Sequence, residues 1–145
     1  MVKLIRKGKK KKGFTLIELV AVVAIIGILA ALLVPKISGY IQDAKKTKVI
    51  DQARKVVMAF DTVNVKNTTP QLDSIKVSAI TSATTGALNE MKEYIVGTST
   101  ESAADILKLL PGTTPVSECK TIIEHNNFNI DPATGAYTVG SAATR

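Results

Sequence analysis

The sequence has few of the residues that usually build reactive or cross-linked sites. Its 145 residues include one cysteine, one histidine and no tryptophan, and aromatic residues make up 4% of the total. A single cysteine excludes an intrachain disulfide, on which many small exported domains depend. A single histidine means that any metal site would need several other ligands around it. The folded part of the chain must therefore be held together by packing alone.

The segment around the histidine is the place where a catalytic group would be sought. Glu118, Cys119, Glu124 and His125 are close in sequence, but a strand there would point Glu124 and His125 to opposite faces. Cys119 has no second cysteine for a redox motif, and we interpret it as a small, semi-buried apolar residue. The sequence contains no glycine-rich phosphate loop and no nucleophile elbow. We therefore expect no enzyme activity, no cofactor and no bound metal.

Acidic residues are absent before Phe14, where seven of the 19 basic residues lie. The rest of the chain has 12 basic and 12 acidic residues, so the net charge of +7 belongs to this first segment. The positive charge therefore does not indicate a nucleic-acid surface, and we expect no nucleic-acid partner. Basic residues on the amino side of an apolar run tend to keep that end in the cytoplasm.

Polar residues are nearly absent from Phe14 to Val34, where Glu18 is the single charged residue. These 21 residues would form about 31 Å of helix, which matches the hydrocarbon core of a bilayer. A secretory signal peptide and a plain membrane anchor are alternatives, but neither explains a glutamate five residues into the run. A carboxylate inside a bilayer is costly unless it is paired. Cleavage between Gly13 and Phe14 would free an amine that can neutralise Glu18, on the same copy or on a neighbour.

A resemblance to the type IV prepilin family lies in the residues GFTLIELVAVVAIIGILAALLVP. The family pattern is a basic leader ending in glycine, a phenylalanine that becomes the first mature residue, and a glutamate five residues into the mature chain. Here these are Gly13, Phe14 and Glu18, and Thr15 and Leu16 match the usual neighbours. The resemblance implies that a prepilin peptidase cuts after Gly13 and methylates the amine of Phe14. It also implies that Phe14, Thr15 and Glu18 take part in filament assembly.

Gly27 and Pro35 fall where this family tends to carry helix-weakening residues. Pro35 lacks an N–H, so the carbonyl of Ala31 loses its helical partner and the helix can bend there. In filaments that resemble this one, the segment between the two positions can lose helical order. A second interpretation, which is compatible with the first, is that Gly27 permits close packing of helices in the membrane.

The sequence divides into four segments: a basic leader (1–13), an apolar membrane and assembly helix (14–34), an amphipathic stem helix (35–63) and a globular head (64–145). Apolar residues recur every three or four positions in the stem, which with the membrane segment predicts one helix of about 50 residues. In the head we expect helices at 87–96 and 102–110, a turn at 131–135, and short strands at 75–80, 120–125, 127–130 and 136–139. The predicted fold class is α+β, with a small antiparallel sheet packed on the long helix as in type IV pilins.

The resemblance implies a structural subunit. The leading interpretation is a major pilin, which forms a homopolymeric extracellular filament for adhesion or motility. A type II secretion pseudopilin and a DNA-uptake pilin are alternatives. The expected partners are the prepilin peptidase and the pilus assembly machinery, and the precursor and subunit pool are expected in the cytoplasmic membrane. A membrane-anchored sensor or enzyme is the alternative from a different class, and it requires an uncut N-terminus.

Overall fold

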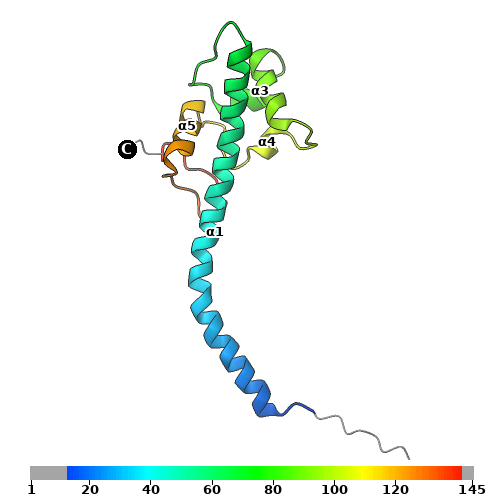
Figure 1. Cartoon of the computed structure of the whole chain (residues 1–145), viewed down its shortest axis with the longest axis vertical. Helices are drawn as coiled ribbons and strands as arrows, with labels where there is room; N and C mark the ends of the chain where they lie inside the picture. The colour runs from blue at the N-terminus through cyan, green and yellow to red at the C-terminus, as the bar shows by residue number, and fades with distance from the viewer. Residues whose placement is uncertain (1–12, 142–145) are drawn as a thin grey trace, which may run out of the picture. The chain divides into compact units, whose positions relative to one another are not determined.

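The computed structural model describes residues 13–141 (Figure 1). The predicted leader, apart from Gly13, therefore lies outside the described residues. The elements are α1 (Leu16–Lys66), α2 (Val77–Ser82), α3 (Gly86–Val96), α4 (Ala103–Ile106) and α5 (Val116–His125). The chain separates into two compact units, with the boundary between Gly39 and Tyr40, and each unit is described by itself.

Helix α1 covers both the predicted membrane segment and the predicted stem, so the prediction of one helix of about 50 residues is confirmed. Its 51 residues correspond to about 77 Å at the usual rise of a helix. Pro35 lies inside α1, and the helix continues on both sides of it. Loss of helical order between Gly27 and Pro35 therefore stays a prediction for the filament.

The first unit contains the apolar part of α1. Among the described residues, α1 is the one helix that is long and apolar enough to cross a membrane, and its most apolar window is 0% buried. The large apolar side chains from Phe14 to Val34 are each more than half exposed. An exposed apolar surface of this extent is typical of a site that contacts a membrane or another protein.

The second unit packs the C-terminal part of α1 against the shorter helices. One stripe of α1 is buried because its apolar residues recur every three or four positions, and it comprises Val49, Ala53, Val56, Phe60 and Val63. Figure 1 shows α5 on one side of this part of α1, and α3 and α4 on the other. The short helices complete the core with Ile80, Met91, Cys119 and Ile122. The head is therefore organised around the distal half of α1.

The predicted antiparallel sheet is not supported. Residues 13–141 form no strand, and their only sheet-like pairings are two isolated bridges, Lys76 with Pro115 and Ile130 with Tyr137. The strand predicted at 120–125 is wrong, because this segment belongs to α5. Its β-branched residues favoured a strand locally, but Val116, Cys119 and Ile122 recur every three positions and are buried on one helical face. Burial against the core therefore overrides the local preference.

The other predicted strands differ from the structure as well. Most of the segment 75–80 belongs to α2, which buries Val77 and Ile80. The turn at 131–135 is confirmed, since the N–H of Gly135 donates to the carbonyl of Asp131 at 2.8 Å. The segments 127–130 and 136–139 meet only at one bridge, so they do not form a strand pair. Among the described residues, the head is helical and is not the sheet of the predicted α+β fold.

Two predicted head helices are confirmed. Helix α3 covers the predicted segment 87–96 and stops at Gly97, whose φ of 54° suits glycine. Helix α4 begins after Ser102, whose Oγ accepts a hydrogen bond from the N–H of Asp105 at 3.2 Å and so caps the first turn. Helix α4 ends at Ile106, earlier than predicted, because a turn follows in which the N–H of Leu110 donates to the carbonyl of Leu107.

We expect Ile122→Ala to lower the free energy of unfolding by about 2–5 kcal/mol, because it leaves a cavity where the side chain is 0% exposed. Glu124→Ala, at an exposed position of α5, is the control and should change it by less than about 0.5 kcal/mol. Chemical unfolding of the full-length chain in detergent, followed by circular dichroism, measures both values. A strand would place 122 and 124 on the same face, so equal losses would contradict the helical assignment.

Candidate processing and assembly site at the start of helix α1

The peptide bond between Gly13 and Phe14 is the predicted cleavage site. Both residues precede α1 and lie outside regular secondary structure. Phe14 is 94% exposed, and a Cβ added at Gly13 would meet no atom within 4 Å. Exposed backbone without helical hydrogen bonds is the kind that a peptidase can bind. The bond is therefore sterically open, and the described part of the chain does not itself require glycine at position 13.

Thr15 and Glu18 form a reciprocal cap on the first turn of α1. The Oε2 atom of Glu18 accepts hydrogen bonds from the backbone N–H and from the hydroxyl of Thr15, each at 2.8 Å. In return, Oγ1 of Thr15 accepts a hydrogen bond from the N–H of Glu18 at 3.3 Å. This capping box satisfies N–H groups that have no partner within the helix. The carboxylate also lies at the positive end of the helix dipole, which stabilises its charge.

The cap holds the Glu18 carboxylate close in sequence to the future N-terminus. Both hydrogen bonds from Thr15 end on Oε2, and Oε1 accepts none from residues 13–141. Cleavage after Gly13 would free the amine of Phe14, the residue that directly precedes the cap. One oxygen of a positioned carboxylate is thus available to an ammonium group. The arrangement can form an ion pair after cleavage, within one copy or between copies.

The six predicted site residues fall in two places. Gly13, Phe14, Thr15 and Glu18 lie together at the start of α1, whereas Gly27 and Pro35 lie farther along it. A Cβ added at Gly27 would meet no atom within 4 Å, so the described part of one chain does not require glycine there. The capping role of Thr15 is not among the roles predicted for it. The pattern Thr-x-x-Glu directly before an apolar run is the sequence sign of a capping box and could have revealed it.

The residues around Cys119 do not form a competing site. Cys119 is 0% exposed, and burial, with a smaller contribution from the charge of Glu118, raises the pKa of its thiol to about 12. His125 Nε2 lies 4.0 Å from Glu124 Oε2. Within residues 13–141, no group of three or more His, Cys, Asp or Glu side chains is placed to hold a metal ion. Cys119 is an apolar core residue, buried more completely than the sequence predicted.

We expect Cys119 in the folded chain to react with a thiol reagent at pH 7 at least about a hundredfold more slowly than in the unfolded chain. The thiolate is the reactive form, and a raised pKa leaves little of it at pH 7. Mass spectrometry after alkylation, with and without denaturant, measures the ratio. The control is the double variant Cys119→Ser/Ser117→Cys, which moves the thiol to an exposed position of α5 and should react quickly when folded. Equal rates for the folded and unfolded wild-type chain would show that Cys119 is accessible.

Comparison with known proteins points to the same end of the chain. The family described as the prokaryotic N-terminal methylation motif matches residues 8–34. Fimbrial protein Q of Moraxella bovis is 44% identical over 62 residues, which are 43% of this chain and 40% of that protein. The type IV major fimbrial protein FimA of Dichelobacter nodosus is 46% identical over 52 residues, 36% of this chain and 33% of that protein. The type II secretion system core protein G of Escherichia coli is 37% identical over 62 residues, 43% of each chain.

These matches cover well under half of each relative, and no solved structure gives a significant match. The three relatives are named as fimbrial or secretion-system proteins, and none of those names describes an enzyme. The family match at residues 8–34 includes the predicted site residues Gly13, Phe14, Thr15, Glu18 and Gly27.

Proposed function

We propose that this type IV pilin-like prepilin is a major pilin, the structural subunit of an extracellular filament that serves adhesion or motility. Similarity to the fimbrial proteins of Moraxella bovis and Dichelobacter nodosus supports this role. The observation that carries the proposal is the capped Glu18 carboxylate at the start of α1, whose apolar segment is 0% buried within residues 13–141. Such a helix is suited to pack against copies of itself.

The first step of this function is removal of the leader by a prepilin peptidase, which cuts between Gly13 and Phe14 and methylates the new amine. The match of the methylation motif to residues 8–34 and the exposure of Phe14 support this step. Cleavage removes the seven basic residues that precede Phe14. Until assembly, the apolar helix would remain in the cytoplasmic membrane, which supplies the surroundings that its exposed side chains need.

The second step is polymerisation with the help of a pilus assembly machinery in the membrane. The Glu18 carboxylate of one subunit would pair with the Phe14 amine of a neighbour, so that neither charge is buried alone. This contact joins two different groups, and is therefore heterologous; when it does not close into a ring it builds an open filament. The apolar side chains between residues 14 and 34 would then be buried among neighbouring copies.

A type II secretion pseudopilin is the second candidate, and the 37% identity to core protein G of Escherichia coli favours it. A pseudopilin would undergo the same processing and pairing, because these steps depend on the same N-terminal residues. It would form a short rod that stays at the cell surface. The two functions therefore differ in the length and location of the polymer.

The test is to shear cells that express the chain at its natural level and to examine the released material by electron microscopy with an antibody against the head. A major pilin is expected to be the most abundant protein of long released filaments. A strain that lacks the gene should then lose these filaments. Filaments that persist in that strain, together with loss of protein secretion, would instead support the pseudopilin.

A further inference from the structure

One side of the second unit carries opposite charges at its two ends. Three adjoining hollows run along this side, which we call the charged face and define by Lys48, Lys55, Lys108, Met58, Tyr94, Glu90 and Glu93. The first hollow is lined by Lys48, Lys55 and Lys108, the second by Lys55, Met58 and Tyr94, and the third by Tyr94, Glu90 and Glu93. Lys55 is thus shared by the first two hollows, and Tyr94 by the last two. The hollows are therefore parts of one continuous surface.

The end of the charged face that contains Lys48 is basic. Lys48, Lys55 and Lys108 line a hollow of about 360 Å³, and all three are exposed. Asp51 also lines it and lies 3.8 Å from Lys55. Neither Lys48 nor Lys108 has an acidic partner within ion-pair distance among residues 13–141. This end therefore has two lysines whose charges are not compensated by a direct ion pair.

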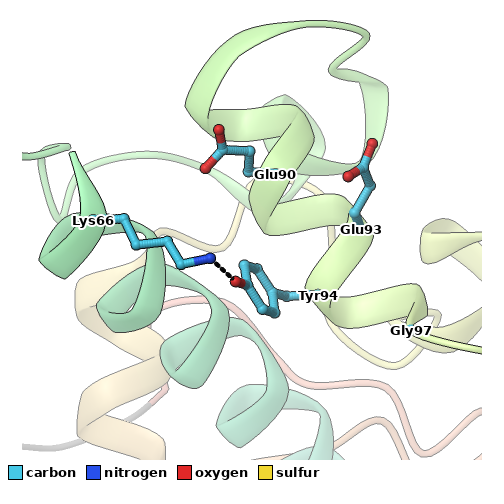
Figure 2. Close-up of a pocket in the computed structure, with 5 residues that line it drawn as sticks. All are labelled: Lys66, Glu90, Glu93, Tyr94 and Gly97. Atoms are coloured by element: carbon cyan, nitrogen blue, oxygen red, sulfur yellow. Dashed lines mark hydrogen bonds between the residues drawn. The ribbon is translucent and has the colours of Figure 1, made fainter.

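The other end of the charged face is acidic. Figure 2 shows Glu90 and Glu93 on α3, with Lys66 pointing to Tyr94 rather than to either carboxylate. The ammonium of Lys66 donates to the hydroxyl of Tyr94 and lies 5.0 Å from the centroid of its ring. Both glutamates are exposed, and neither forms an ion pair within residues 13–141. This end therefore presents two carboxylates beside one ammonium that is already hydrogen-bonded.

The middle of the charged face is apolar. Met58 is 68% exposed and Tyr94 is 46% exposed, and both line the second hollow. Exposed methionine and tyrosine, with charged residues around them, are typical of protein–protein interfaces. The composition of the charged face thus suits another protein surface that has complementary charge.

The two ends form no direct ion pair with each other within residues 13–141. Lys55 at the basic end and Lys66 at the acidic end are 11 residues apart on α1, which is about 16 Å along the helix. This separation is about twice the Debye length of roughly 8 Å at physiological ionic strength. A second copy, displaced along the direction of α1, would bring a basic end beside an acidic end.

We propose that the basic end of the charged face on one copy binds the acidic end of the charged face on a second copy. Glu90 and Glu93 of the second copy would then lie at the hollow of Lys48, Lys55 and Lys108. The proposal rests on the proposed function, since it names the contact between heads in the same filament. Each copy uses its two ends with two different neighbours, so the contact extends along the polymer. Charge complementarity would fix the axial displacement between neighbouring heads.

The test is a charge exchange in the full-length chain, expressed in cells. Lys48→Glu/Lys108→Glu and Glu90→Lys/Glu93→Lys should each lower the yield of sheared filaments at least about tenfold, because like charges then face each other. The four substitutions combined restore opposite charges and should return the yield to within about twofold of wild type. Immunoblots of the processed subunit in the membrane show whether each variant is made and cut normally.

The matched control is Lys76→Glu/Asp61→Lys, at two exposed positions that line none of the three hollows. It should assemble as wild type. Normal yield from both paired variants, or failure of the combined variant to regain filaments, would overturn this contact and leave the filament itself intact. If the wild-type chain forms no filament, the proposed function fails and the contact fails with it.

Discussion

Glu18→Ala and Glu18→Gln should each leave cleavage between Gly13 and Phe14 intact and reduce filament assembly by more than about a hundredfold. In the polymer, each substitution leaves the amine of Phe14 buried without its counter-ion, and such breakage of a buried pair is strongly unfavourable. Cleavage should proceed, because the peptide bond lies before α1, outside regular secondary structure, and Phe14 is exposed.

The two substitutions differ in what they remove. Glutamine keeps an oxygen that can accept the hydrogen bonds from the N–H and hydroxyl of Thr15, whereas alanine removes the cap and the charge together. If capping were the only role of Glu18, the glutamine variant would assemble and the alanine variant would be impaired. The yield of sheared filaments, normalised to processed subunit in the membrane, measures the effect. Normal yield from both variants would contradict the pairing of Glu18 with the amine.

Gly13→Leu should leave the precursor uncut, with the processed fraction below about a tenth of wild type, because leucine cannot adopt every backbone conformation open to glycine and adds bulk beside the bond. A Cβ at position 13 meets no atom within 4 Å, so the substitution should not disturb the described part of the chain. The uncut chain would keep its basic leader and have no free amine at Phe14. It should therefore form no filaments.

The matched control is Gly8→Leu, which introduces the same side chain five residues before position 13. It should be processed as wild type, because the cut bond is unchanged. Gel mobility and the intact mass of the membrane subunit distinguish the cut from the uncut chain. Normal processing of Gly13→Leu would exclude the proposed cleavage requirement.

The long helix could be predicted from the sequence because its determinants are local. Two patterns extend over many turns: the apolar run from Phe14 to Val34 and the repeat of apolar residues in the stem. Each pattern by itself predicts a helix along its whole length. Glu18 could be singled out because one charge in an apolar run needs a physical reason. Its hydrogen bonds with Thr15 form a capping box, and the sequence pattern Thr-x-x-Glu is typical of this motif.

The head could not be predicted to the same extent because its short segments depend on distant residues. The segment 120–125 favours a strand by composition, but it forms a helix that buries Cys119 and Ile122 in a core built on α1. Glu118 accepts hydrogen bonds from the hydroxyl of Tyr137 and from the N–H of Gly140, contacts between residues about 20 positions apart. The charged face likewise combines residues of α1 and α3 that no local pattern connects.

Mass spectrometry of the N-terminus of the protein from assembled material is the most direct test of the processing at Phe14, on which the pairing with Glu18 depends. We predict a mature chain that begins at Phe14, carries a methyl group on its amine, and comes from a polymer. A chain recovered from cells with residues 1–12 still attached, and with no polymer present, would contradict it.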